Sequence, residues 1–88
     1  EVDSDFPGIP RVCIIDEAIP FVGKGRNVMH GYIFGADSHI IPGQPCIVVD
    51  SKGTLVAHGT PLTSHLEMQF LRKGIAVKVR DGAIKQGQ

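Results

Sequence analysis

The spacing of turn-forming residues constrains this chain more than any other feature of its sequence. In the second half such residues recur at short intervals, at Pro42-Gly43, Asp50-Ser51-Lys52-Gly53 and Lys73-Gly74. The apolar runs between them are too short for long helices and suit strands. The run Cys46–Val49, the turn that follows it, and a return run from Thr54 to about Gly59 therefore predict a β-hairpin.

The first half predicts a strand, a short helix and a second strand. The run Val12–Ile15 is entirely apolar and predicts a buried strand, and Asp16 is expected to cap a helix that runs through Phe21-Val22. The next segment, Asn27–Phe34, alternates in a way that predicts a strand. One face of it would carry Val28, His30, Tyr32 and Phe34.

The last third predicts a helix followed by a final strand. Ser64 and Glu67 form a capping-box pattern, and the apolar stripe of the helix is expected at Leu66, Phe70 and Leu71. Arg72 and Lys73 would occupy its last turn, and Gly74 would adopt the left-handed conformation that ends it. In the strand Ile75–Arg80, three residues would face the core, Ile75, Val77 and Val79, while Lys78 and Arg80 project from the other side.

Length and composition indicate one small domain. The chain has 88 residues, 42% of them hydrophobic, and a formal net charge of zero. One modest core fits this length, and no apolar run approaches the roughly 20 residues of a membrane span. Acidic residues gather near the start and basic residues near the end, so any anion site is expected toward the C-terminal end.

The two cysteines and the start of the chain bear on its setting. Cys13 and Cys46 lie in apolar runs, which suits reduced thiols in a cytoplasmic compartment, with one disulfide as the alternative. We expect no secretion signal. Because the chain starts at Glu1 and not at methionine, we interpret it as a domain of a longer protein.

The order of these elements resembles the PUA domain, the small RNA-binding module of pseudouridine synthases and archaeosine transglycosylases. The resemblance is greatest to the C-terminal domain of archaeal tRNA-guanine transglycosylases. It rests on segments spread over most of the chain, namely 21–28, Ala36-Asp37, Ile41-Pro42-Gly43, Val48-Val49-Asp50, Gly53, Gly59, Glu67-Met68 and 74–80. The resemblance implies a mixed α/β, mainly β pseudobarrel of about six strands with two short helices. We expect an irregular lead-in over 1–10, the PUA-like domain over 11–82 and a flexible tail over 83–88.

The resemblance also implies where RNA would bind. By position it points to Lys24, Gly25, Arg26 and Asn27 after the first helix, and to Lys78 and Arg80 on the last strand. Tyr32 is a candidate for stacking on a base, with packing in the core as the alternative. Arg72 and Lys73 are expected as helix-terminal charges with phosphate contact as a second role. Gly31 stands where transglycosylase relatives often place a lysine, so that part of the basic surface is missing.

Each of these residues also has a purely structural interpretation. Gly23-Lys24-Gly25-Arg26 offers backbone donors beside two cations, yet it lacks the spacing of a nucleotide-binding P-loop and could simply end a helix. Lys78 and Arg80 could form an ordinary solvated strand face.

No pattern in the sequence indicates catalysis or a metal site. Zinc sites usually contain pairs of cysteine or histidine ligands that lie close together in the sequence. Such pairs are lacking among the candidate ligands, which are His30, His39, His58, His65, Cys13 and Cys46. Capping explains Asp16-Glu17 and Ser64-His65 better than acid-base or nucleophilic chemistry does. We therefore expect no enzyme activity, no cofactor and no metal in this chain.

The leading hypothesis is a domain that docks on structured RNA, tRNA or rRNA, through phosphate and shape recognition. It would serve as an accessory to RNA modification, with a catalytic domain of the same parent protein as a further partner and no membrane contact. The alternative is a protein-protein or interdomain module that uses apolar residues around Met29, Ile33 and Phe34.

Overall fold

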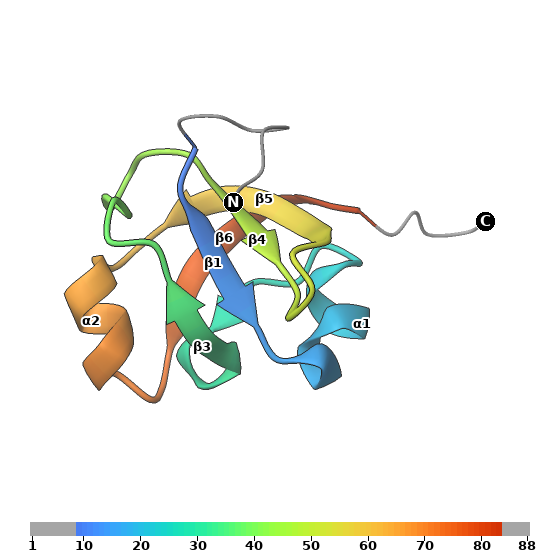
Figure 1. The fold of residues 1–88 in the computed structure, drawn as a ribbon, viewed down its shortest axis with the longest axis horizontal. Coiled ribbons are helices and arrows are strands. Elements are labelled where there is room, and N and C mark those ends of the chain that lie inside the picture. The colour runs from blue at the N-terminus through green and yellow to red at the C-terminus, as the bar shows by residue number, and fades with distance from the viewer. Residues whose placement is uncertain (1–8, 84–88) are drawn as a thin grey trace.

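A computed structural model describes residues 9–83, which form one curved sheet flanked by short helices (Figure 1). The strands are β1 (Arg11–Ile14), β2 (Val28–Met29), β3 (Ile33–Ala36), β4 (Cys46–Val49), β5 (Leu55–Pro61) and β6 (Ile75–Gly82). The helices are the 3-10 helices η1 (Asp16–Ala18) and η2 (His30–Tyr32) and the α-helices α1 (Ile19–Val22) and α2 (His65–Phe70). The lead-in and tail expected from the sequence lie almost wholly outside the described residues.

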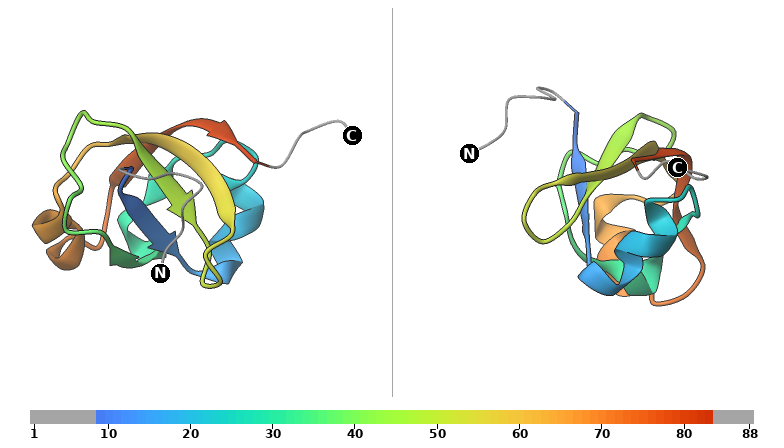
Figure 2. Two further views of the ribbon diagram at one scale, coloured as in Figure 1. Left: turned by 45° about the horizontal axis from the view of Figure 1, so that its top comes forward. Right: turned by 90° about the vertical axis from the view of Figure 1, so that its right-hand side faces the viewer.

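The sheet has the order β2-β6-β5-β4-β1-β3 and curls into a nearly closed barrel (Figure 2). All neighbouring strands run antiparallel except β1 and β4, which are parallel. The pseudobarrel of six strands and short helices expected from the sequence is therefore confirmed. In Figure 1, α1 and α2 lie at opposite ends of the barrel.

The core fills the inside of the barrel with small branched side chains. Val12, Val48 and Ala57 lie opposite one another on three neighbouring strands and are buried. The strand β4 is buried along its whole length, which explains why its sequence is continuously apolar. The hairpin of β4 and β5 is confirmed, with the turn closed by Asp50, whose Oδ1 accepts from the N–H groups of Lys52 and Thr54.

The continuous strand expected over Asn27–Phe34 is wrong. Only Val28–Met29 pairs with β6, and the chain then turns through η2 before β3 begins. His30 causes this turn because its side chain is buried and its backbone N–H donates to Gly74 O at 3.0 Å. The break places Phe34 on the surface, where 56% of it is exposed, and not on the face that it was expected to share with Val28.

Asp16 does not cap the first helix as expected. Ile15 holds the N-cap position of η1 and makes no side-chain capping bond, whereas Asp16 Oδ1 accepts from Ser51 Oγ at 3.0 Å. The carboxylate therefore ties η1 to the turn between β4 and β5. Helix α1 ends at Val22, as expected.

The capping box of α2 is confirmed, but the rest of that helix differs from the expectation. Glu67 N–H donates to Ser64 Oγ at 3.2 Å, and Ser64 N–H donates to Glu67 Oε1 at 2.8 Å. Met68 is the buried residue of α2, while the stripe expected to pack inward is exposed, with Phe70 at 74%. The helix ends at Phe70, so Arg72 and Lys73 lie in the following loop and not in its last turn.

The last strand follows the predicted position with one difference in its facing. Gly74 has a φ of +87°, as expected, and lets the chain enter β6. Val77 is buried and Val79 packs against the core, but Ile75 is 39% exposed because the pairing with β2 shifts register near it. Among the described residues, no helix is long and apolar enough to cross a membrane.

Candidate nucleic-acid interface

The segment between α1 and β2, residues 24–27, is a tight turn whose backbone donors are already in use. The N–H groups of Lys24 and Arg26 both donate to Phe21 O at 3.2 Å, and Gly25 N–H donates to Val22 O at 3.0 Å. Gly25 has a φ of +106°, a conformation that glycine adopts without steric cost. These three amides cannot also cradle a phosphate, so a phosphate contact from residues 24–26 must come from the two cationic side chains.

Asn27 fastens this turn to the last strand. Its side-chain Oδ1 accepts from Val79 N–H at 3.0 Å, at the point where β2 no longer pairs with β6. The side chain thereby satisfies a partly buried strand donor that would otherwise lack a partner. Asn27 has a structural role in addition to the RNA contact that the resemblance implies.

A glycine pair brings the turn and the end of β6 still closer. A Cβ atom added to Gly82 would lie 2.0 Å from Gly23 O and 2.7 Å from Gly25 N, so only glycine fits there. Residues 24–27 therefore lie beside Lys78–Gly82, although 52 positions separate Asn27 from Val79 along the sequence.

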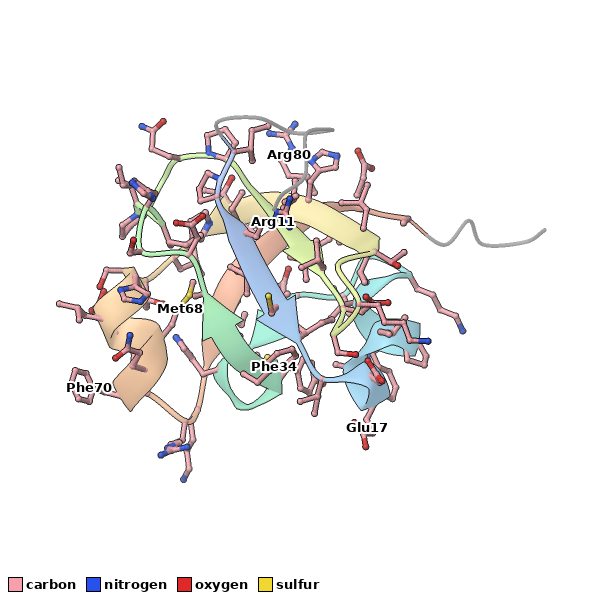
Figure 3. The ribbon with its side chains drawn as sticks, in the orientation of Figure 1. Arg11, Glu17, Phe34, Met68, Phe70 and Arg80 are labelled. Atoms are coloured by element: carbon pink, nitrogen blue, oxygen red, sulfur yellow. The ribbon has the colours of Figure 1, made fainter. Side chains whose placement is uncertain are left out.

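Lys78 and Arg80 are both exposed on β6, and a bulge sets their direction. Thr60 lies opposite Lys78 and His58 opposite Asp81, so Arg80 is the extra residue of the bulge. Figure 3 shows Arg80 at the upper side of the barrel, remote from Glu17 at the lower side. Within residues 9–83 no ion pair is formed by Arg26, Lys78 or Arg80.

One acidic residue interrupts this basic strand end. Asp81 Oδ2 lies 3.4 Å from His58 Nε2, and both side chains are more than half exposed. The carboxylate carries a negative charge next to Arg80 in the chain. It lowers the positive potential beside Arg80.

Three other predicted contacts, Tyr32, Arg72 and Lys73, lie at the opposite end of β6. From Ile75 to Arg80 the strand extends about 16 Å, at about 3.3 Å per residue. Tyr32 is half-buried in η2 and packs against the core, which is the alternative to base stacking that the sequence left open. Arg72 and Lys73 are exposed in the loop that precedes β6.

His30 holds that loop in place. Its Nδ1 lies 2.9 Å from Lys73 O and 3.1 Å from Gly74 O, and both carbonyls accept, so Nδ1 carries the hydrogen. Its Nε2 lies 3.0 Å from Thr63 Oγ1 and can accept from that hydroxyl. One buried ring thus joins η2 to the loops on both sides of α2.

The cysteine and histidine side chains do not converge on a metal site in the described part of the chain. No three His, Cys, Asp or Glu side chains of residues 9–83 are grouped closely enough to hold an ion. Burial raises the pKa of the Cys46 thiol to about 12, and desolvation also raises the pKa of Cys13. The Asp37 carboxylate accepts from the N–H and ring nitrogen of His39, which lowers its pKa.

Phe21 was not singled out from the sequence as a site residue. Its ring is 49% exposed in α1, and its carbonyl accepts the two N–H groups that shape residues 24–27. An exposed aromatic ring beside cations is a surface on which an unpaired base can stack. The signal available in the sequence was Pro20 together with Gly23 and Gly25, which keep the helix short, and so short a helix buries few side chains.

The six-stranded sheet with its short helices places the protein in the class of small pseudobarrel domains, in which the turn at residues 24–27 meets the last strand. More particularly, the chain belongs to the PUA domain family, whose pattern matches residues 10–83. A tRNA-guanine(15) transglycosylase of Picrophilus torridus is 38% identical over 81 residues, which cover 92% of this chain and 13% of that protein. The chain thus spans about an eighth of that relative.

Solved structures show the same fold. NSun6 from Pyrococcus horikoshii superimposes with a TM-score of 0.83 at 29% identity, covering 93% of this chain and 22% of that one. A chain of the archaeal box H/ACA sRNP Nop10-Cbf5 complex gives a TM-score of 0.83 at 30% identity, covering 90% of this chain and 25% of that one.

Proposed function

We propose that this domain binds structured RNA, with tRNA as its target, and serves as a non-catalytic accessory to RNA modification in the cytoplasm. Two comparisons support the proposal. The similar transglycosylases are named for tRNA, and a structure of an H/ACA RNP bound to a substrate RNA contains a chain with a TM-score of 0.83 to this one at 29% identity. Its further partner would be a catalytic domain of the same parent protein.

The observation that carries the proposal is the hydrogen bond from Val79 N–H to Asn27 Oδ1. This bond sets the turn that bears Lys24 and Arg26 beside the strand that bears Lys78 and Arg80. Cations held on two adjacent backbone segments suit a run of phosphates, because RNA affinity comes largely from phosphate neutralisation. A domain of zero net charge can bind RNA in this way because the charges act locally.

The remaining predicted contacts would extend the footprint along β6. Arg72 and Lys73 would meet phosphates at the η2 end of β6, whereas Arg80 lies about 16 Å from Ile75 along the strand, at about 3.3 Å per residue. Tyr32 would contribute through the exposed part of its ring. Gly25 and Asn27 would shape the turn while Lys24 and Arg26 make the contacts.

A second candidate function, an interdomain or protein-protein contact, is favoured by one observation. Several large apolar side chains are exposed around α2 and β3, including Leu66, Phe70, Leu71 and Phe34. A large contiguous apolar patch on a protein surface usually marks a site of contact with another protein or domain.

A salt titration with charge-reversal variants tests the RNA proposal. Binding to tRNA would be measured by fluorescence anisotropy. The logarithm of Kd is expected to rise linearly with the logarithm of the salt concentration. Arg26→Glu and Arg80→Glu should each weaken binding about tenfold and reduce the salt slope by about 1. Lys52→Glu, an exposed lysine in the turn between β4 and β5, is the matched control and should stay within about twofold of the wild type. Equal losses in all three variants, or binding that ignores salt, would contradict the proposal.

A further inference from the structure

A groove of about 280 Å³ lies between β3 and α2, and of the residues proposed above to contact RNA only Arg72 lines it. Figure 1 shows α2 standing beside β3, and Figure 3 places Met68 in the space between them. Met68 is almost buried and forms the floor, and Leu71 contributes to one wall. The volume is close to the lower end, about 300 Å³, of pockets that hold small ligands.

Main-chain hydrogen-bonding groups line one side of the groove. The strand β3 ends the sheet, so its outer edge pairs with no other strand of the described residues. Asp37 N–H donates to Arg11 O, which makes this pair the hydrogen-bonded one and turns the N–H and C=O of the preceding residue, Ala36, away from β1. These two groups therefore face the side on which α2 lies.

Polar side chains line the other side, and the groove carries a positive charge. Arg72 is the only Asp, Glu, Lys or Arg among the described residues that line it, and within residues 9–83 it forms no ion pair. Gln69 Nε2 lies 2.9 Å from His65 Nε2, which leaves the carboxamide oxygen available as an acceptor. The bonds from His30 to the carbonyls of Lys73 and Gly74 fix the backbone next to Arg72.

We propose that this groove binds one unpaired nucleotide, with its phosphate on Arg72 and its base over Met68 and Leu71. A guanidinium binds phosphate with directed, charge-assisted hydrogen bonds. The main-chain groups of Ala36 and the amide of Gln69 supply the donors and acceptors that a base edge requires. That the nucleotide belongs to a bound RNA strand rests on the proposed function, whereas the nucleotide chemistry of the groove does not.

An extended peptide added to the edge of β3 fits the groove less well. Strand addition uses a row of exposed main-chain pairs, and alternate residues supply them. The strand β3 has four residues, and Phe34 is a bulged residue with no partner on β1. One usable pair, at Ala36, suits a base edge better than a peptide backbone.

Nuclear magnetic resonance titration separates these possibilities. Uniformly ¹⁵N-labelled protein would be titrated with an unstructured RNA pentamer, with adenosine monophosphate, and with an acidic pentapeptide. The pentamer is expected to shift the amides of Ala36, Gln69 and Arg72. Arg72→Glu should weaken pentamer binding about tenfold, whereas Leu66→Ala, on the exposed side of α2, should leave it within about twofold. The dispersion of the amide spectrum would verify that each variant is folded.

The outcomes distinguish this groove from the proposed RNA interface. Arg26→Glu should retain the groove shifts, so their survival alongside lost tRNA binding supports two separate sites. Pentamer shifts confined to residues 24–27 and β6, or equal losses in Arg72→Glu and Leu66→Ala, would overturn the groove while leaving the proposed function standing. Shifts of the groove by the peptide and not by the pentamer would overturn it as well. If adenosine monophosphate binds the groove as tightly as the pentamer does, the groove is a nucleotide site, and the claim that its nucleotide belongs to an RNA strand is overturned.

Discussion

At the scale of single residues, several polar side chains do structural work that their position in the sequence did not reveal. Asn27 completes a strand ladder, Asp16 binds a hydroxyl in a distant turn, and His30 holds two loops through both ring nitrogens. The bonds of Asn27 and His30 satisfy partly buried groups that would otherwise be unpaired, whereas the bond of Asp16 lies on the surface. Polar residues in this small barrel therefore contribute to the fold before they contribute to binding.

The buried thiol of Cys46 predicts a pH dependence of stability. Its pKa is raised from the ordinary 9.0 to about 12, so the folded state holds the proton more strongly than the unfolded state does. The stabilisation is complete below pH 9 and is lost as the pH rises from 9 toward about 12. Cys46→Ala should cost about 1 kcal/mol in free energy of unfolding at pH 7 because it leaves a small cavity.

Urea denaturation of the wild type and of Cys46→Ala at several pH values measures this effect. The stability advantage of the wild type over the variant should be constant below pH 9 and shrink as the pH rises from 9 toward about 12. Because the two proteins differ only at residue 46, any effect of pH that they share cancels in the comparison. An advantage that stays constant over this range would show that the thiol does not control the alkaline loss.

At the scale of elements, the meeting of β5 and β6 determines where the basic side chains point. The register shifts between His58 and Gly59, which inserts Arg80 as a bulge and places two residues of β6 opposite one of β5. A Cβ atom on Gly59 would lie 2.2 Å from Lys78 O and 2.8 Å from Val79 Cα. The absence of a side chain at this glycine allows the close approach of the two strands.

Gly59→Ala should destabilise the domain and at the same time displace β6, the strand that carries Lys78 and Arg80. Because the added methyl group meets backbone atoms, which cannot rotate away, we expect a loss of about 1–3 kcal/mol in free energy of unfolding. Gly31→Ala is the matched control, since its nearest neighbour would be Arg72 O at 3.7 Å, an ordinary contact. It should change stability by less than about 1 kcal/mol. Thermal denaturation would measure the stability of both variants. Similar losses of stability in the two would refute the idea that the close approach of β5 and β6 requires glycine at position 59.

At the scale of the whole molecule, the basic turn and an exposed apolar region lie at different ends of the barrel. Residues 24–27 and the end of β6 lie near α1, whereas four large exposed apolar side chains belong to or adjoin α2 and β3 at the other end, namely Phe34, Leu66, Phe70 and Leu71 (Figure 1). The two regions can therefore serve different partners at the same time. An RNA contact at one end and a contact with a neighbouring domain at the other are physically compatible.

Polar substitution of the apolar region tests this separation. The double variant Leu66→Ser, Phe70→Ser should change the free energy of unfolding by less than about 0.5 kcal/mol, because both side chains are largely exposed. Its affinity for tRNA should match that of the wild type. Urea denaturation and anisotropy provide the two measurements, and a loss of tRNA affinity without unfolding would place RNA on the exposed face of α2, outside the groove that Met68 and Arg72 line.

The sequence by itself determined the class of fold and most of its elements. Apolar runs of strand length, the turn at Asp50–Gly53 and the capping box of Ser64 and Glu67 are local signals, and each acts over a few residues. The ordered resemblance over most of the chain added the pseudobarrel and the residues at which RNA would bind. The runs, the turn and the cap were accessible because neighbouring residues largely specify them, whereas the barrel came only from the resemblance.

Only the tertiary structure decided which side chains face inward and which segments meet. The alternation of Asn27–Phe34 predicted a strand, but the buried ring of His30 and its bonds to Lys73 and Gly74 turn the chain there and expose Phe34. The contact of Asn27 with Val79 and that of Gly82 with Gly23 join segments more than 50 positions apart. Such contacts depend on how the sheet closes on itself, and no local pattern of residues records that closure.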